Sequence, residues 1–124
     1  MKTVVVINEA HTLMEDQKRV LEELNKDFEF LKVPTDGWTY EEQISVAEEL
    51  ITKADQVVFA SPIPALLMIL SRVEGIKHFA KMEGEDSIEV RVLHNDQRVA
   101  KEIPDGKGGV RMIHTVSPTG WILV

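Results

Sequence analysis

The sequence predicts an α/β fold: one domain with a mostly parallel sheet, three helices and an antiparallel, β-rich C-terminal extension. Short apolar runs rich in β-branched residues, at 3–7 and 57–60, have the composition of buried strands. Each is followed by a segment in which apolar residues recur at helical spacing. The last third of the chain lacks this helical period and places turn residues between extended segments. We therefore expect a single domain over residues 1–124, with a core over 1–96 and a β-rich tail over 97–124.

The first predicted strand, residues 3–7, is bounded by polar residues and leads into a helix. Thr12 and Glu15 have the spacing of a capping box, in which a hydroxyl and a glutamate three residues later satisfy free N–H groups. This pattern predicts Thr12 as the N-cap of a helix that continues to about Asn25.

A second strand is predicted over residues 28–33, where apolar and polar residues alternate up to Pro34. Thr39 and Glu42 form a second capping box. The apolar residues that follow have helical spacing, which predicts a helix to about Ala54.

The third strand is predicted over residues 57–60. Ser61 suits an N-cap and Pro62 is favoured as a first helical residue, so a third helix is predicted from Pro62 onward. Its first turns, 62–70, are apolar nearly all the way round. This pattern is typical of a helix that is buried by the sheet and by another subunit.

The tail is predicted to be extended. Residues 88–93 alternate like a strand, and 104–109 combine proline, aspartate and glycines as a turn does. Two more extended segments follow at 110–116 and 120–124. These segments predict added antiparallel strands or a projecting hairpin.

Composition and charge exclude several classes of function. With 44% hydrophobic and 28% charged residues, the 124-residue chain can bury a core of ordinary size. The absence of cysteine excludes disulfides, thiolate zinc sites and thiol nucleophiles. A net charge of −7 disfavours duplex DNA and long RNA as partners. It does not exclude a small anion in a local pocket, because salt screens distant charges.

The N-terminus has four consecutive apolar residues after Met1-Lys2-Thr3, too few for a signal peptide or a membrane span. We therefore expect a cytoplasmic protein without a membrane partner.

The first strand ends in Asn8-Glu9-Ala10-His11, which differs by one residue from the Asp-Glu-Ala-His box of helicases. In that box the aspartate holds magnesium and a separate glycine-rich loop holds the phosphate. Asn8 is a poor magnesium ligand, and the chain contains no G-x-x-x-x-G-K-[ST] loop. The sequence therefore argues against an ATPase.

Three loops follow the carboxyl ends of predicted parallel strands, where ligands bind in open α/β sheets. They are residues 8–12, 34–39 and 61–64. Each leads into a predicted helix N-terminus, whose free N–H groups favour anions. The third loop contains two prolines, which lack an N–H group. A site there would rely on the Ser61 hydroxyl and the Ile63 N–H.

Four side chains in the first two loops have alternative roles. His11 suits proton transfer, because an imidazole exchanges protons near neutral pH, and equally suits packing in the first helical turn. Asn8 can orient a ligand or cap the loop. Glu9 is better suited to capping or to facing solvent than to catalysis. Trp38 can stack on a base or cover the edge of the core.

Ser61 is a candidate N-cap first and a phosphate ligand second. Arg72, on the third helix, can reach a phosphate if that helix lines a dimer groove, or can pair with Glu74 or Asp55. No metal-ligand spacing links the remaining histidines, His78, His94 and His114, so we expect no metal site.

One family carries similar motifs. The chain has Asn8-x-x-His11-x-Leu13-x-x-x-Gln17 after a strand, a second strand that ends in Pro34, and then Ala60-Ser61-Pro62-Ile63-Pro64-Ala65-Leu66. With these motifs it resembles the small stand-alone CRISPR-associated proteins that have a CARF-like, Rossmann-like core. The resemblance covers most of the chain but not the tail.

The resemblance implies a homodimer that binds a cyclic oligoadenylate second messenger, such as cyclic tetra-adenylate, in antiviral defence. Several such proteins are ring nucleases, in which a ribose 2′-OH attacks its adjacent phosphate without a metal or cofactor. His11 and Ser61 would then be catalytic. The residues that would bind the ligand are Asn8, Glu9, Thr12, Thr35, Trp38, Ser61, Ile63 and Arg72.

Two other interpretations stay open. The same fold and site would serve a nucleotide sensor that binds without cleaving. Alternatively, the chain is an interaction protein whose apolar third helix docks on a partner.

Overall fold

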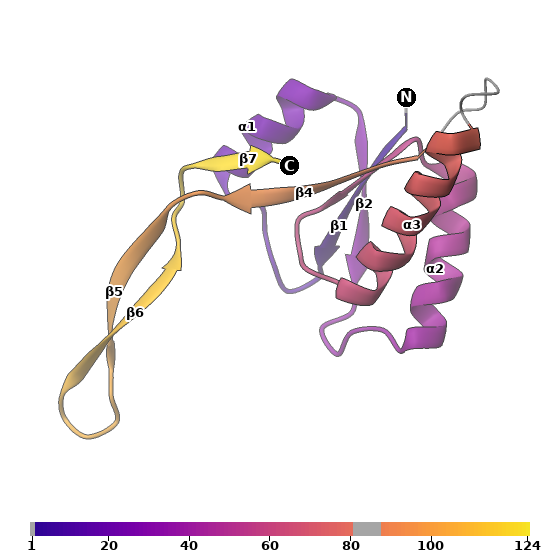
Figure 1. Cartoon of the computed structure of the whole chain (residues 1–124). Helices are drawn as coiled ribbons and strands as arrows, with labels where there is room; N and C mark the ends of the chain where they lie inside the picture. Colours follow the sequence, from indigo (N-terminus) through magenta and orange to yellow (C-terminus); the bar gives the residue numbers. More distant parts are fainter. Residues whose placement is uncertain (1, 81–87) are drawn as a thin grey trace.

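The described residues form three helices and seven strands (Figure 1). The computed structural model describes residues 2–80 and 88–124, with the backbone alone for 73–80. The elements in chain order are β1 (Thr3–Asn8), α1 (Glu15–Leu24), β2 (Phe28–Val33), α2 (Tyr40–Lys53), β3 (Gln56–Phe59), α3 (Pro64–Ala80), β4 (Glu89–Asn95), β5 (Arg98–Pro104), β6 (Val110–Val116) and β7 (Trp121–Leu123). The predicted α/β class is confirmed, and β1 to β4 lie within two residues of their predicted positions.

Five strands form one sheet in the order β2-β1-β3-β4-β7. The first four are parallel, whereas β7 runs antiparallel to β4. The register aligns Val5 of β1 with Phe30 of β2 and Val58 of β3, and aligns Val58 with Arg91 of β4. The four parallel strands therefore end at one edge of the sheet. The predicted mostly parallel sheet with an antiparallel extension is confirmed.

Alternating residues of the central strands point into two hydrophobic layers, as the pleat of a strand requires. Val6 packs in the layer that contains Leu50 of α2 and Leu66 of α3. Its neighbour Val5 packs in the opposite layer, with Leu21 of α1. Each fully buried side chain of this size contributes about 1.5–3 kcal/mol. The two layers thus fix the sheet between α1 on one face and α2 with α3 on the other.

The helix α2 begins as predicted. Its N-cap is Thr39, whose side chain accepts a hydrogen bond from the Glu42 N–H at 3.1 Å. The helix ends at Lys53.

The helix α1 begins later than predicted, at Glu15. The Asn8 side chain accepts a hydrogen bond from the Ala10 N–H at 2.9 Å, and the His11 N–H donates to the Asn8 carbonyl at 2.9 Å. Asparagine side chains favour such local turns over helix. The chain therefore turns before it becomes helical, and the prediction of Thr12 as the N-cap is wrong.

The helix α3 also begins later than predicted, at Pro64 rather than Pro62. A proline disfavours helical conformation in the residue before it, so Pro64 excludes Ile63 from the helix. The Ile63 carbonyl accepts the first helical hydrogen bond, from the Leu67 N–H at 2.9 Å. The prediction that Ser61 is the N-cap is consequently wrong.

The tail forms a hairpin of β5 and β6 that projects from the body (Figure 1). Its register pairs Lys101 with Ile113. In the turn, the Asp105 carboxylate accepts hydrogen bonds from the Lys107 N–H at 2.7 Å and the Gly109 N–H at 3.1 Å. The predicted hairpin and turn are confirmed, whereas β5 was not predicted as a strand.

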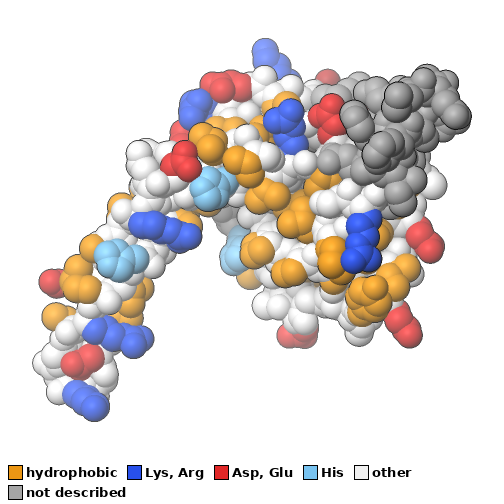
Figure 2. Space-filling model, viewed as in Figure 1, with side chains coloured by type: hydrophobic (Ala, Val, Ile, Leu, Met, Phe, Trp, Pro, Cys, Tyr) orange, Lys and Arg blue, Asp and Glu red, His pale blue; other side chains and the backbone are white. Residues whose placement is uncertain are grey.

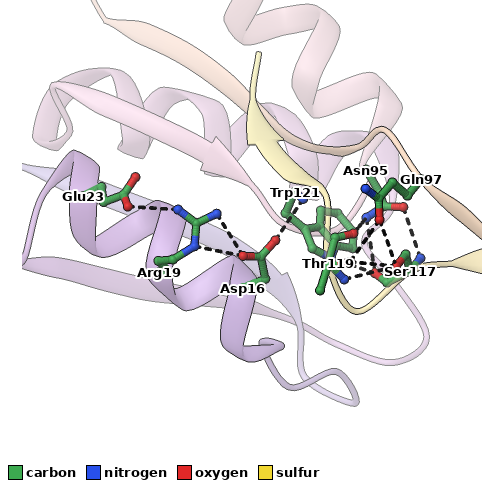
Figure 3. A network of polar contacts seen from close by, with 8 residues as sticks. All are labelled: Asp16, Arg19, Glu23, Asn95, Gln97, Ser117, Thr119 and Trp121. Atoms are coloured by element: carbon green, nitrogen blue, oxygen red, sulfur yellow. Dashed lines mark hydrogen bonds and ion pairs between the residues drawn. The ribbon is translucent and has the colours of Figure 1, made fainter.

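A network of polar contacts fixes the base of the hairpin (Figure 3). The Asn95 amide donates to the carbonyls of Ser117 at 3.2 Å and Thr119 at 2.8 Å. The Trp121 indole N–H donates to the Ser117 carbonyl at 3.0 Å, and the Trp121 backbone N–H donates to the Asp16 carboxylate at 3.0 Å. The network joins β4, the hairpin, β7 and α1 near the edge where the parallel strands end.

Candidate ligand-binding site

A cavity of about 590 Å³ lies at the carboxyl edge of the parallel strands. This volume falls within the range of about 300–1,000 Å³ that is typical of small-molecule sites. Its walls are mostly apolar and include Phe59 at the end of β3 and Trp121 of β7. The polar side chains that line it are His11, Thr12, Gln17, His94, Asn95 and Arg98.

The structure brings together three residues that the sequence predicted for the site. The His11 Nδ1 atom lies 3.3 Å from the Ser61 Oγ atom. The same Oγ accepts a hydrogen bond from the Asn8 N–H at 2.9 Å. Ser61 is only 4% exposed, and it is not among the residues that line the cavity.

These contacts are compatible with two tautomers of His11. With the Asn8 N–H donating to the Ser61 oxygen, either the Ser61 hydroxyl donates to Nδ1 or an Nδ1–H donates to the second lone pair of the Ser61 oxygen. In the first arrangement the ring proton of a neutral His11 resides on Nε2. In that arrangement His11 offers an Nε2–H donor to a ligand, while Ser61 contacts its Nδ1 atom.

The lining of the cavity is basic although the chain carries a net charge of −7. It contains Arg98 and two histidines, His11 and His94, and no aspartate or glutamate occurs among the described lining residues. Among the described contacts, one carboxylate pairs with a lining histidine. The Asp96 Oδ1 atom lies 3.0 Å from the Nε2 atom of His94. Figure 2 shows histidine and basic side chains where the hairpin meets the body. A basic, partly apolar cavity favours an anionic ligand.

Glu9 and Thr35, both predicted to bind the ligand, bind each other. The Thr35 N–H and hydroxyl donate to the Glu9 carboxylate at 2.9 and 3.0 Å. The backbone hydrogen bond from Thr35, and then the hydroxyl one, lower the pKa of Glu9. This contact joins the loops after β1 and β2, outside the lining of the cavity.

Trp38, Ile63 and Arg72 do not line the cavity. Trp38 and Ile63 are half-buried against the core on the side of α2 and α3, and Arg72 is exposed on α3. The Gln43 side chain donates to the Trp38 carbonyl at 3.1 Å and accepts from the Leu66 N–H at 2.9 Å. An N–H group in the first turn of α3 is therefore occupied by α2, which weakens the expected anion site at that helix end.

The side of the cavity that β4 and β7 supply was not predicted from the sequence. His94, Asn95 and Arg98 lie at or beyond the carboxyl end of the strand predicted over 88–93. A signal for them existed, because this strand is parallel to the others and its end contributes a fourth loop to the same edge. Trp121 had no such signal, since antiparallel β7 brings it there.

The described residues contain no group of three or more His, Asp or Glu side chains placed to hold a metal ion. The side chain of His78 lies outside those described. In the described part of the chain, no helix is both long and apolar enough to cross a membrane.

Comparisons with protein-family models, curated proteins and solved structures found no match to this chain.

Proposed function

We propose that the protein binds a nucleotide in this cavity, and that the ligand is a cyclic oligoadenylate. One observation carries the proposal: the charged or titratable lining residues are Arg98, His11 and His94, in a chain of net charge −7. The apolar wall with Phe59 and Trp121 suits a purine ring, and the basic side chains suit its phosphate. A nucleotide combines these two kinds of surface in one molecule.

The proposed reaction is cleavage of the ring without a metal. The ribose 2′-OH attacks the adjacent phosphorus, the bond from phosphorus to the 5′ oxygen breaks, and a 2′,3′-cyclic phosphate and a 5′-OH remain. A water molecule accepts the proton of the 2′-OH, and the 5′ oxygen gains one. In its imidazolium form His11 is suited to transfer the Nε2 proton to the leaving 5′ oxygen, which leaves a neutral imidazole, and as a neutral imidazole with its proton on Nε2 it is suited to hydrogen-bond a nonbridging oxygen. Arg98 is suited to hold the phosphate in line with the attacking oxygen.

The second candidate function is binding without cleavage. One observation favours it: the buried Ser61 hydroxyl is held by the Asn8 N–H and His11, so it supplies neither a nucleophile nor a second proton-transfer group in the cavity. His11 would then act only as a hydrogen-bond donor, and the protein would sense or sequester the nucleotide.

The test measures binding of cyclic tetra-adenylate by calorimetry and its cleavage by chromatography of a labelled sample. We expect His11→Ala to reduce turnover by about 10²–10⁴-fold, the usual contribution of a general acid or base. Binding should weaken by no more than about tenfold, because Arg98 still contacts the phosphate. The matched control is His114→Ala, an exposed histidine on β6, which should retain both properties.

The arginine provides a separate test of the binding site. Arg98→Ala should weaken binding by about tenfold or more, since it removes a charge-assisted hydrogen bond. Lys101→Ala removes a cation from the same strand but outside the cavity lining, and should bind like the parent. Binding without turnover in the parent would assign a sensor, and neither binding nor cleavage at micromolar protein would contradict the proposal.

A further inference from the structure

The β5–β6 hairpin has two unlike faces. Directly paired residues of an antiparallel hairpin point to the same side, and alternate residues along each strand share that side. One side is therefore formed by the pairs Val99–Thr115, Lys101–Ile113 and Ile103–Arg111. We name these six residues the basic hairpin face.

The basic hairpin face combines positive charge with apolar surface. It contains Lys101 and Arg111 and no carboxylate, whereas the opposite side of the hairpin contains both Arg98 and the carboxylate of Glu102. Val99 is 39% exposed, and its isoleucines are half-buried. Figure 2 shows basic and hydrophobic side chains together along the projecting hairpin.

The hairpin is stabilised little by packing against the rest of its own chain. Its two strands pack mainly on each other and stand apart from the body (Figure 1). Isolated two-stranded hairpins are only marginally stable in water, so a further surface against this face would stabilise it. Residues 98–116 contain four Lys or Arg and two Asp or Glu, a net charge of +2. The rest of the chain contains ten Lys or Arg and nineteen Asp or Glu, a net charge of −9.

The outer side of α2 has the complementary chemistry. Tyr40, Ile44 and Glu48 follow one another at four-residue spacing and so form a stripe, with Glu41 beside it. Tyr40 is 58% exposed and Ile44 is 36% exposed, and both glutamates are exposed. We name these four residues the acidic α2 face.

We propose that the basic hairpin face docks on the acidic α2 face of a second copy of this chain. Figure 1 places the hairpin and α2 at opposite ends of the molecule, so a chain cannot make this contact with itself. A strand of seven residues spans about 24 Å, more than the width of a helix. In a two-fold dimer each copy gives its hairpin and receives that of its partner.

The proposal uses neither the cavity nor a ligand, so it stands or falls separately from the proposed function. Nucleic acid is the other partner that basic hairpins can contact. The net charge of −9 on the rest of the chain opposes it, and the exposed Val99 beside half-buried isoleucines suits a protein better than a phosphate backbone.

The test exchanges charges between the two faces and measures mass by light scattering during size-exclusion chromatography. The unmodified chain, 14.0 kDa as a monomer, should dimerise with increasing concentration. Lys101→Glu with Arg111→Glu should weaken self-association about tenfold or more, and so should Glu41→Lys with Glu48→Lys. An equimolar mixture of the two double variants should form heterodimers, because each hairpin then meets an α2 face of opposite charge.

The matched control is Lys26→Glu with Lys32→Glu, which changes net charge equally at exposed lysines outside both faces and should dimerise like the parent. A parent that stays monomeric, or a mixture that fails to associate, overturns the proposal. It is also overturned if the parent binds labelled duplex DNA as a monomer and the hairpin variant does not, which would assign the face to nucleic acid.

Discussion

Ser61 is the residue on which the local order of the candidate site depends most. It is 4% exposed, and its oxygen accepts the Asn8 N–H while facing the His11 ring. We predict that Ser61→Ala lowers the free energy of unfolding by about 1–3 kcal/mol, because the Asn8 N–H loses its acceptor. The same variant should increase the fraction of His11 protonated on Nδ1, which ¹⁵N NMR of the imidazole measures.

The control for this prediction is Ser45→Ala, at an exposed position on α2. It should change the unfolding free energy by no more than about 0.5 kcal/mol in a urea titration. If Ser61→Ala matches this control in stability and leaves the His11 tautomer unchanged, Ser61 does not position the imidazole.

At the residue scale, the sequence could predict which side chains lie near one another, but not which of them form contacts. Asn8, His11 and Ser61 meet because parallel strands end at one edge, a rule that needs only the strand pattern. The same rule applies to Trp38, yet its indole packs on the core. Side-chain direction within a loop depends on turns and packing that no spacing in the sequence encodes.

At the element scale, one carboxylate joins α1 to β7. The Trp121 N–H and then the Arg19 guanidinium lower the pKa of Asp16 (Figure 3). A carboxylate with a lowered folded-state pKa stabilises the fold fully above its unfolded value, about 3.9 for aspartate. That contribution is lost as the pH falls through the folded-state pKa. We therefore predict that Asp16→Asn is less stable than the parent at pH 7, and that the difference shrinks below about pH 4.

Chemical unfolding of parent and variant between neutral and acidic pH measures this difference. Glu22→Gln, an exposed carboxylate on the same helix, is the control and should differ little from the parent at any pH. A gap between Asp16→Asn and the parent that stays constant as the pH falls would show that the charge of Asp16 does not hold β7.

The helix starts show which features of an element the sequence encodes. Thr39 is an N-cap in sequence and structure, where its side chain accepts the hydrogen bond from the Glu42 N–H. The starts of α1 and α3 were misplaced because the turn at Asn8 and the restraint of Pro64 on Ile63 act before the helix does. The starts of both helices were decided by competing local structure rather than by helix propensity.

At the scale of the whole molecule, periodicity predicted the order of strands and helices along the chain, whereas the position of the tail depended on contacts far apart in sequence. Successive residues of β1 point into the two layers of the core, and its continuous apolar run over 4–7 fits a strand that is buried on both faces. β5 has mostly exposed residues, so its hydrophobic pattern gave no strand signal. Its position follows from pairing with β6 and from the network at Asn95.

This division between body and hairpin leads to a prediction for hydrogen exchange. Amides of β1 and β3 lie in buried central strands and should exchange only on global unfolding. Amides of β5 and β6 should exchange faster in dilute solution, because the hairpin packs mainly on itself.

If the hairpin docks on a second copy, its exchange should slow as protein concentration rises, while exchange in β1 stays constant. Mass-spectrometric exchange at two concentrations measures both. Hairpin amides that are as protected as those of β1 under conditions where the chain is monomeric would show that the hairpin belongs to the cooperative body.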